Sequence, residues 1–239
     1  MKLAFIGYGA MGQLVEREAE AAGDEIGVKL TSDDSEQGVD ELAAMLRRHD
    51  VAVDFSIGSV VLKNVEACAL AGVPLVEGTT GWKDQESRAK EIVTEHGGAL
   101  VYGANFSIGV NVFYRIIRNA AKLFGGLDQY EAFIEEQHHS RKRDAPSGTA
   151  LQLKNVMSEF IKAEIPIAST RAGHIPGTHR VGFDSAADQI TLTHTARSRE
   201  GFAAGALLAA RWIIGRKGVF EFSEVIDEML ESHPAVRQR

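Results

Sequence analysis

Short apolar runs alternate with helical patterns along the first hundred residues. The runs are too short for helices and have the length of buried strands; they lie at 2–6, 25–30, 51–55, 73–77 and 99–103. Between them, apolar residues recur every three to four positions, as on one face of a helix, at about 11–22, 39–48, 60–72 and 83–96. Buried strands separated by helices predict a parallel sheet that is covered on both faces.

The pattern changes after Asn105. Residues 109–124 and about 148–162 have helical spacing, 130–138 has the pattern of a strand, and 189–196 alternates like a half-buried strand. This order is typical of an α+β unit. We therefore expect two domains, one formed by residues 1–107 with 201–239 and the other by residues 108–200. In this division the helix predicted at 202–214 returns to the first domain.

Composition and charge exclude several classes of protein. Hydrophobic residues make up 44% of the chain and charged residues 25%, which is ordinary for a soluble protein. The net charge of −7 argues against nucleic acid as the main partner. The apolar run at the N-terminus stops at Ile6, and the run at 202–210 is too short to span a bilayer. We expect a cytoplasmic protein with no membrane partner, in which the lone Cys68 is a small buried residue.

A glycine-rich loop follows the first predicted strand and opens the first predicted helix. Its residues Gly7, Tyr8, Gly9, Ala10, Met11 and Gly12 match G-x-G-x-x-G in the context that this motif requires. The glycines allow the backbone to approach a pyrophosphate at the helix N-terminus. The fold class expected is therefore α/β, with an N-terminal Rossmann dinucleotide-binding domain.

The choice between NADH and NADPH stays open at the end of the second predicted strand. Thr31 and Ser32 can accept a 2′-phosphate, whereas Asp33 would repel one.

Two further loops lie at the carboxyl ends of predicted strands, where open parallel sheets bind ligands. One contains Gly78, Thr79 and Thr80, and the other contains Gly103, Ala104, Asn105 and Phe106. Both offer backbone N–H groups and small side chains to a cofactor. The alternative interpretation is that they are ordinary strand-to-helix turns.

The segment EEQHHSRKRDAPSGTA, residues 135–150, concentrates positive charge in an acidic protein. His138 and His139 end a predicted strand, and Ser147 is suited to cap the helix that follows. A helix N-terminus beside histidines and a lysine favours a bound carboxylate, and histidine suits proton transfer near neutral pH. We expect an active site for an anionic substrate; a solvated charge run is the alternative. Adjacent histidines lack the spacing of metal ligands, so no metal is expected.

This segment resembles the signature E-x-H-H-x-x-K-x-D-A-P-S-G-T-A of the 4-hydroxy-tetrahydrodipicolinate reductase (dihydrodipicolinate reductase) family. The resemblance extends to GTTGW, GANFSIGVNV, RAGHIPGTHRVGF and HTARSREGFAAGALLAARW. It implies an NAD(P)H-dependent oxidoreductase of diaminopimelate and lysine biosynthesis. Such an enzyme reduces 4-hydroxy-tetrahydrodipicolinate, a small dicarboxylate, to tetrahydrodipicolinate with loss of water.

The resemblance also implies roles for single residues. His138 would be the proton donor and Lys142 a cationic acid or charge stabiliser, while His139, Gly148 and Thr149 would bind a substrate carboxylate. The three loops would hold NADH or NADPH. Residues 108–200 would form an α+β substrate-binding and oligomerisation domain, through which the family assembles as a homotetramer.

The chain departs from the family pattern at two places, both in the expected cofactor site. Ala10 stands where a basic residue is common, and Thr31-Ser32 replaces an acid-arginine pair. Two other functions are weighed against the reductase. One is another two-domain Rossmann reductase, such as an amino-acid or semialdehyde dehydrogenase. The other is a non-catalytic redox sensor that binds a dinucleotide.

Overall fold

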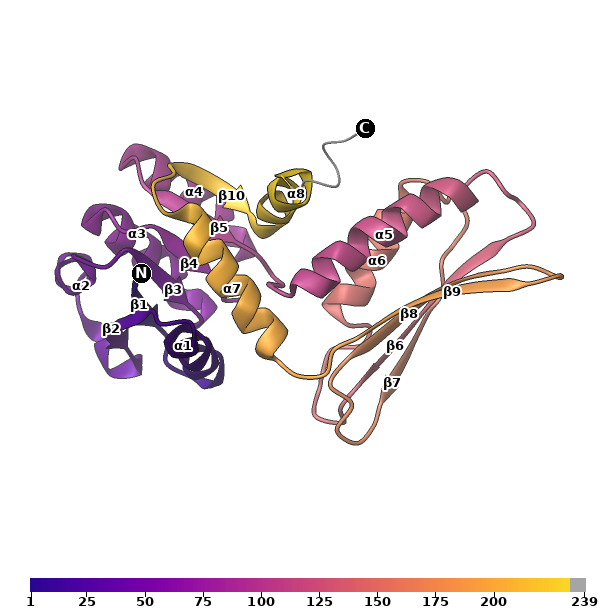
Figure 1. Ribbon diagram of the computed structural model, residues 1–239, viewed down its shortest axis with the longest axis horizontal. Helices are drawn as coiled ribbons and strands as arrows, with labels where there is room; N and C mark the ends of the chain where they lie inside the picture. The colour runs from indigo at the N-terminus through magenta and orange to yellow at the C-terminus, as the bar shows by residue number, and fades with distance from the viewer. Residues whose placement is uncertain (233–239) are drawn as a thin grey trace. The chain divides into compact units, whose positions relative to one another are not determined.

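The computed structural model describes residues 1–232, which divide into two compact units (Figure 1). The first joins Met1–Ile108 to the chain from Glu200 onward, and the second is Gly109–Arg199. The first domain was expected to extend to residue 239; its last seven residues, 233–239, lie outside the described residues.

A six-stranded sheet forms the centre of the first unit within the described residues, and the predicted parallel pairing is confirmed. Its order is β10-β5-β4-β3-β1-β2. The strands are β1 (Lys2–Ile6), β2 (Glu25–Leu30), β3 (Val51–Asp54), β4 (Leu75–Glu77), β5 (Ala99–Tyr102) and β10 (Gly218–Glu221). The sequence did not predict β10, because four residues after a helix carry too little periodicity. It becomes a strand by pairing with β5, far away in the chain.

Helices cover both faces of this sheet. One face carries α2 (Val39–Leu46), α3 (Val61–Ala71) and α4 (Glu86–Glu95); the other carries α1 (Ala10–Ala21), α7 (Glu200–Ile213) and α8 (Phe222–Ser232). Short 3-10 turns precede α2, α3 and α4: η1 (Ser32–Glu36), η2 (Gly58–Val60) and η3 (Lys83–Gln85). The inner strands β1, β3, β4 and β5 are buried on both sides, which explains their continuous apolar runs, whereas the edge strands β2 and β10 are only partly buried. Cys68 is buried in α3, and this burial raises the pKa of its thiol well above the ordinary value.

The second unit is a four-stranded mixed sheet with two helices on one face (Figure 1). Its elements are α5 (Ile108–Phe124), β6 (Glu131–His138), α6 (Gly148–Ser158), β7 (Ile167–Arg171), β8 (Thr178–Asp184) and β9 (Gln189–Thr195). The order is β7-β6-β8-β9, and only β6 and β7 are parallel. Ile117 of α5, Leu153 of α6, Ile134 and Phe183 pack in the core between the helices and the sheet.

The second unit differs from the expected pattern at two places. The helix predicted to reach residue 162 ends at Ser158. The strands β7 and β8 were missed, because polar residues and glycine dilute their apolar positions. Both are held in place by β6, which pairs with β7 on one side and with β8 on the other.

Candidate active site

The glycine loop connects β1 to α1, and each of its glycines has a separate structural reason. Gly7 has a φ of +77°, and a Cβ there would lie 2.5 Å from the backbone nitrogen of Ser56. A Cβ on Gly12 would lie 2.6 Å from the carbonyl oxygen of Gly7. Gly9 is the N-cap of α1 without any side-chain cap, and no atom lies within 4 Å of a Cβ placed there. The first and third glycines therefore serve packing, whereas Gly9 leaves the helix N-terminus open to a ligand.

The remaining residues of the loop lie at the start of α1. The Tyr8 hydroxyl is hydrogen-bonded to the buried Glu16 carboxylate, which also forms an ion pair with Lys29. Ala10 is exposed and Met11 is half-buried.

A cavity of about 460 Å³ opens beside this loop, within the size range of small-molecule sites. Its walls come from Gly7, Tyr8 and Gly9, from the end of β2 and η1, and from residues that follow β3. Two charged residues line it, Asp34 and Lys63. The Asp34 carboxylate accepts a hydrogen bond from the Thr31 amide at 2.8 Å, and Lys63 donates to the carbonyl of Gln37 at 3.2 Å.

The loop after β4 packs tightly against the segment that follows β3. A Cβ on Gly78 would lie 2.2 Å from the ring of Phe55, so a side chain cannot fit there. The Thr79 amide donates to the Glu77 carboxyl group at 2.6 Å, so this N–H points inward, while Thr80 is exposed.

The loop after β5 is anchored by an aromatic side chain. The Phe106 ring is buried, with its centroid 6.3 Å from that of Phe55 and 4.6 Å from that of Phe222. The Asn105 side chain accepts a hydrogen bond from the Ser107 amide at 2.9 Å. Ala104 is exposed, and Gly103 lies against Phe222. Because β1, β4 and β5 are parallel, all three loops lie at the same carboxyl edge of the sheet.

Two carboxyl groups that the sequence analysis did not single out are buried at this edge. Asp54 ends β3 and Glu77 ends β4, and both are fully buried. They are hydrogen-bonded to each other, and Asn64 donates to Asp54 at 2.7 Å. Burial raises the pKa of both groups, and the Asp54 charge raises that of Glu77 further. Burial and their mutual repulsion therefore favour the protonated form of this pair, and the pKa of Glu77 is the one raised well above its ordinary value.

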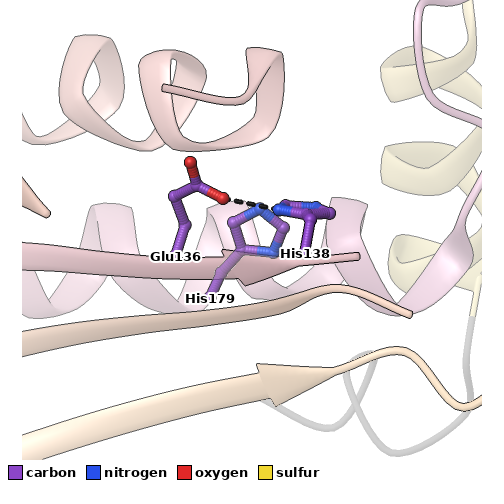
Figure 2. Close-up of side chains that lie close together, drawn as sticks. All are labelled: Glu136, His138 and His179. Carbon is purple, nitrogen blue, oxygen red and sulfur yellow. Dashed lines mark hydrogen bonds and ion pairs between the residues drawn. The ribbon is translucent and has the colours of Figure 1, made fainter. Parts of the chain in front are cut away.

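The histidine segment lies in the second unit, where β6 ends (Figure 2). His138 is the last residue of β6, and its Nδ1 lies 2.5 Å from Glu136, two residues earlier on the same face of the strand. Arg171, at the end of β7, donates two hydrogen bonds to Glu136, at 2.7 and 2.9 Å. The amide of Ser147 donates to the same carboxylate at 3.2 Å. Neither Glu136 nor Arg171 was predicted from the sequence, because the two come together only through the pairing of β6 with β7.

His179 of β8 completes this cluster. Its Nε2 lies 3.1 Å from the hydroxyl of Ser147, and its ring centroid lies 5.1 Å from that of His138. Burial lowers the pKa of His179 to about 4, so this ring is neutral near pH 7. Burial also lowers the pKa of His138, although the Glu136 carboxylate opposes this shift.

Among the described residues, Glu136, His138 and His179 could each offer one ligand atom to a metal, with these atoms within 4.8 Å of one another. However, Arg171 is already bound to both oxygens of Glu136. A metal would have to displace this guanidinium or accept its repulsion. The cluster is therefore better suited to holding and moving protons than to binding a cation.

The other predicted residues of this site surround the N-terminus of α6. Lys142 forms an ion pair with Asp144 at 2.8 Å, and the Nδ1 of His139 is buried without a hydrogen-bond partner. Gly148 begins α6, and nothing lies within 4 Å of a Cβ placed there. The side chain of Thr149 is hydrogen-bonded to Tyr114, a residue that the sequence gave no reason to single out.

Fold and site together define a two-unit oxidoreductase with a Rossmann-type sheet and a separate unit that holds a polar, histidine-containing site. Family models agree in both units: "Dihydrodipicolinate reductase, N-terminus" matches residues 1–106 and "Dihydrodipicolinate reductase, C-terminus" matches residues 109–226. The chain belongs to the dihydrodipicolinate reductase family.

Relatives with this family name match most of the chain. It is 37% identical to a 4-hydroxy-tetrahydrodipicolinate reductase of Christiangramia forsetii, over 97% of this chain and 100% of that protein. It is 35% identical to one of Anaeromyxobacter dehalogenans, over 86% of this chain and 80% of that protein.

A solved structure supports the fold. A dipicolinate-bound dihydrodipicolinate reductase from Paenisporosarcina sp. TG-14 superposes with a TM-score of 0.76 at 20% identity, covering 92% of this chain and 97% of that one. Within residues 1–232, no helix is long and apolar enough to cross a membrane.

Proposed function

We propose that this protein reduces 4-hydroxy-tetrahydrodipicolinate to tetrahydrodipicolinate with loss of water, using NADH or NADPH. The observation that carries the proposal is the cluster at the end of β6. There His138 is hydrogen-bonded to the buried carboxylate of Glu136, near the N-terminus of α6. A dicarboxylate substrate needs positive charge and free N–H groups in a protein that otherwise repels it. This site supplies both, in a chain of net charge −7.

The substrate carboxylate is bound at the N-terminus of α6. Gly148 leaves room for it, since no atom lies within 4 Å of a Cβ there, and the first amides of the helix point toward it. The Thr149 hydroxyl and the unpartnered Nδ1 of His139 add hydrogen bonds. Lys142 lies near enough to His138 to lower its pKa and adds positive charge to the site, part of which Asp144 balances.

Proton transfer is assigned to His138. Because Nδ1 donates to Glu136, the proton that leaves for the substrate is carried on Nε2. The lowered pKa of His138 leaves the ring mostly neutral in the free protein, and the two negative charges of a bound substrate favour its protonation. Lys142 stabilises the negative charge that hydride addition creates on the substrate.

The cofactor is held by the first unit, and when bound it supplies the hydride. Gly7–Gly12 hold the pyrophosphate at the N-terminus of α1, and the cavity between Tyr8 and Lys63 takes the adenosine end. The loops at Gly78–Thr80 and Gly103–Phe106 lie at the same carboxyl edge of the sheet. They contribute to the remainder of the cofactor site.

The assembly proposed is a homotetramer formed through the second unit, in the cytoplasm where biosynthetic enzymes of this family act. One face of the mixed sheet is covered by α5 and α6, and the other has no covering element in its own unit (Figure 1). On that other face, the Phe133 ring packs over Gly182 and Thr191 pairs beside it. A sheet face that contains an aromatic residue and threonines is suited to packing against a second sheet.

A steady-state assay tests the proposed reaction. The condensation product of pyruvate and aspartate semialdehyde is supplied with each cofactor, and NAD(P)H absorbance is followed. Consumption that depends on this substrate supports the proposal. Cofactor binding without turnover would favour a redox sensor, and turnover of amino acids or semialdehydes alone would favour another Rossmann reductase.

A further inference from the structure

Glu136 is a fully buried carboxylate of β6 that contacts both His138 and the N-cap residue of α6. One oxygen lies 2.5 Å from His138 Nδ1, and the other accepts the Ser147 amide at 3.2 Å. Ser147 is the N-cap of α6, and its own hydroxyl accepts from the Ala150 amide. A single carboxylate therefore joins the proposed proton donor to the helix end that receives the substrate.

Arg171 keeps this carboxylate charged although it is buried. Its guanidinium donates to both oxygens of Glu136 and also to the carbonyl of Asp144 at 2.5 Å. Burial alone raises the pKa of Glu136, but hydrogen bonds from Arg171, Ser169 and His138 outweigh it and lower the pKa to about 2. The Glu136 carboxylate is thus charged near neutral pH.

The geometry also decides which nitrogen of His138 is free. Nδ1 is taken by Glu136, so Nε2 is left for the substrate. Gly177 lies on the Nε2 side, where a Cβ would be 3.1 Å from that nitrogen. The charged or titratable groups that face this ring are Glu136, Lys142, Arg171 and His179. Among them, Glu136 is the acceptor that lies within hydrogen-bond distance of Nδ1 and can fix the ring through its Nδ1–H.

We propose that Glu136, fixed by Arg171, is a positioning residue that orients His138 with Nε2 toward the substrate and stabilises its imidazolium form. The same carboxylate sets the distance between His138 and the N-terminus of α6 through the Ser147 amide. This inference rests on the proposed reductase function. It places Glu136 in the role of an acid that orients a histidine and stabilises its charged form, while the proton itself moves through His138.

Glu136→Gln tests the proposal, because it keeps the shape and removes the charge. We expect kcat to fall about 10²–10⁴-fold, as when an acid–histidine pair is broken, with little change in cofactor affinity. The alkaline limb of the pH profile of kcat/KM, where the proton donor is lost, should also shift to lower pH, because His138 loses the charge that favours its protonation. A near-normal kcat with an unshifted limb would overturn the proposal.

Glu135→Gln is the matched control. Glu135 is the preceding residue of β6, on the opposite face of the sheet, and forms an ion pair with Arg180 that is partly exposed. Such pairs contribute little to stability. This variant should keep both kcat and the pH profile, and light scattering should show that its assembly is unchanged. If it loses as much activity as Glu136→Gln, the effect is not specific to the site.

A pair of Arg171 variants separates positioning from folding. Arg171→Met leaves Glu136 without its cation and should lower kcat, whereas Arg171→Lys keeps the charge and should recover part of the loss. If Arg171 has only a structural role, the loss of kcat in each variant should follow its loss of melting temperature. Equal kcat values in the two variants, at equal melting temperature, would contradict the proposal.

The tautomer of His138 gives a readout that does not need turnover. In ¹⁵N-labelled protein, with the signal assigned by its loss in His138→Gln, neutral His138 should carry its proton on Nδ1. In Glu136→Gln it should become a mixture of both tautomers. If the wild-type protein shows no turnover, the proposed reductase function is wrong, but the tautomer of His138 can still be measured. An unchanged tautomer in an active enzyme would overturn the positioning role alone.

Discussion

The hydroxyl of Thr149, the second residue of α6, can either hydrogen-bond a substrate carboxylate or only stabilise the start of the helix. A hydrogen bond to a charged group contributes about 1.5–3 kcal/mol, so Thr149→Val should raise KM roughly ten- to a hundredfold with kcat nearly unchanged. Steady-state kinetics measure this. An unchanged KM with a lowered melting temperature would reduce Thr149 to a scaffolding residue.

Tyr114→Phe is the control for this prediction. It removes the side-chain partner of Thr149 that the structure shows and leaves the threonine hydroxyl in place. KM should therefore stay near the wild-type value in this variant. A rise in KM equal to that of Thr149→Val would mean that Tyr114, rather than the hydroxyl of Thr149, decides substrate binding.

The buried Asp54–Glu77 pair predicts a pH dependence of stability. The pKa of Glu77 is raised well above its ordinary value, chiefly by burial. The unfolded chain releases this proton from about pH 4.3 upward, whereas the folded protein retains it. The contribution of Glu77 to the free energy of unfolding is therefore fully present below about pH 4.3 and is lost as pH rises through the folded pKa.

Glu77→Gln removes this cost, since an amide can donate to Asp54 without a titrating proton. The variant should melt higher than wild type at pH 8, by about 2–4 °C for each kcal/mol gained, and the difference should shrink near pH 4. Melting curves across this pH range measure the effect. A variant that melts lower than wild type at pH 8 would contradict it.

At the scale of elements, α7 approaches the loop after β5 through one glycine. A Cβ on Gly205 would lie 1.7 Å from the carbonyl oxygen of Phe106, and a backbone atom cannot rotate away. Gly205→Ala should therefore cost at least about 1–3 kcal/mol, the usual range for overpacking, and displace the loop at Gly103–Phe106. Thermal melting and cofactor titration should show losses in both stability and affinity.

Gly201, near the start of the same helix, is the matched control. The nearest atom to a Cβ there is the Ser107 hydroxyl at 3.9 Å, an ordinary contact. Gly201→Ala should be neutral or stabilise the protein by about 0.4–1 kcal/mol, because alanine loses less chain entropy in a helix. If both variants melt alike, the close approach of Gly205 does not constrain the fold.

At the scale of the whole molecule, the uncovered face of the mixed sheet predicts the assembly. Light scattering should give four times the 25.9 kDa chain mass. Thr191→Glu places a charge on this face and should dissociate the tetramer, since a symmetric interface would repeat the charge. Ser87→Glu, exposed on α4 of the first unit, should leave the mass unchanged. A wild-type mass of 25.9 kDa would contradict the proposed assembly.

Cofactor preference is also a property of the whole protein, because it is measured as the ratio of kcat/KM with NADH and with NADPH. Thr31 and Ser32 favour a 2′-phosphate, while Asp33 opposes it, and all three are exposed at the end of β2. The balance should stay under about 1.4 kcal/mol, so kcat/KM with NADH and NADPH should agree within about tenfold. A ratio above a thousand in either direction would contradict this expectation.

The sequence by itself determined the features that depend on near neighbours. The parallel sheet followed from apolar runs of strand length, and the glycine loop from glycines between a strand and a helix. The N-cap at Ser147 was also predicted, and its side chain does accept the Ala150 amide. These features are readable because hydrophobic period and capping are set within a few residues of the chain.

Only the tertiary structure decided which distant groups meet. Arg171 reaches Glu136 because β7 pairs with β6 in a register that sets Arg171 beside His138. Asp54 meets Glu77 because β3 and β4 are neighbours that end at the same edge. β10 exists because β5 offers it an edge 119 residues away in the chain, where Val219 pairs with Leu100. The physical reason is that a buried charge or a short strand is stabilised by its partner, and pairing and register choose that partner.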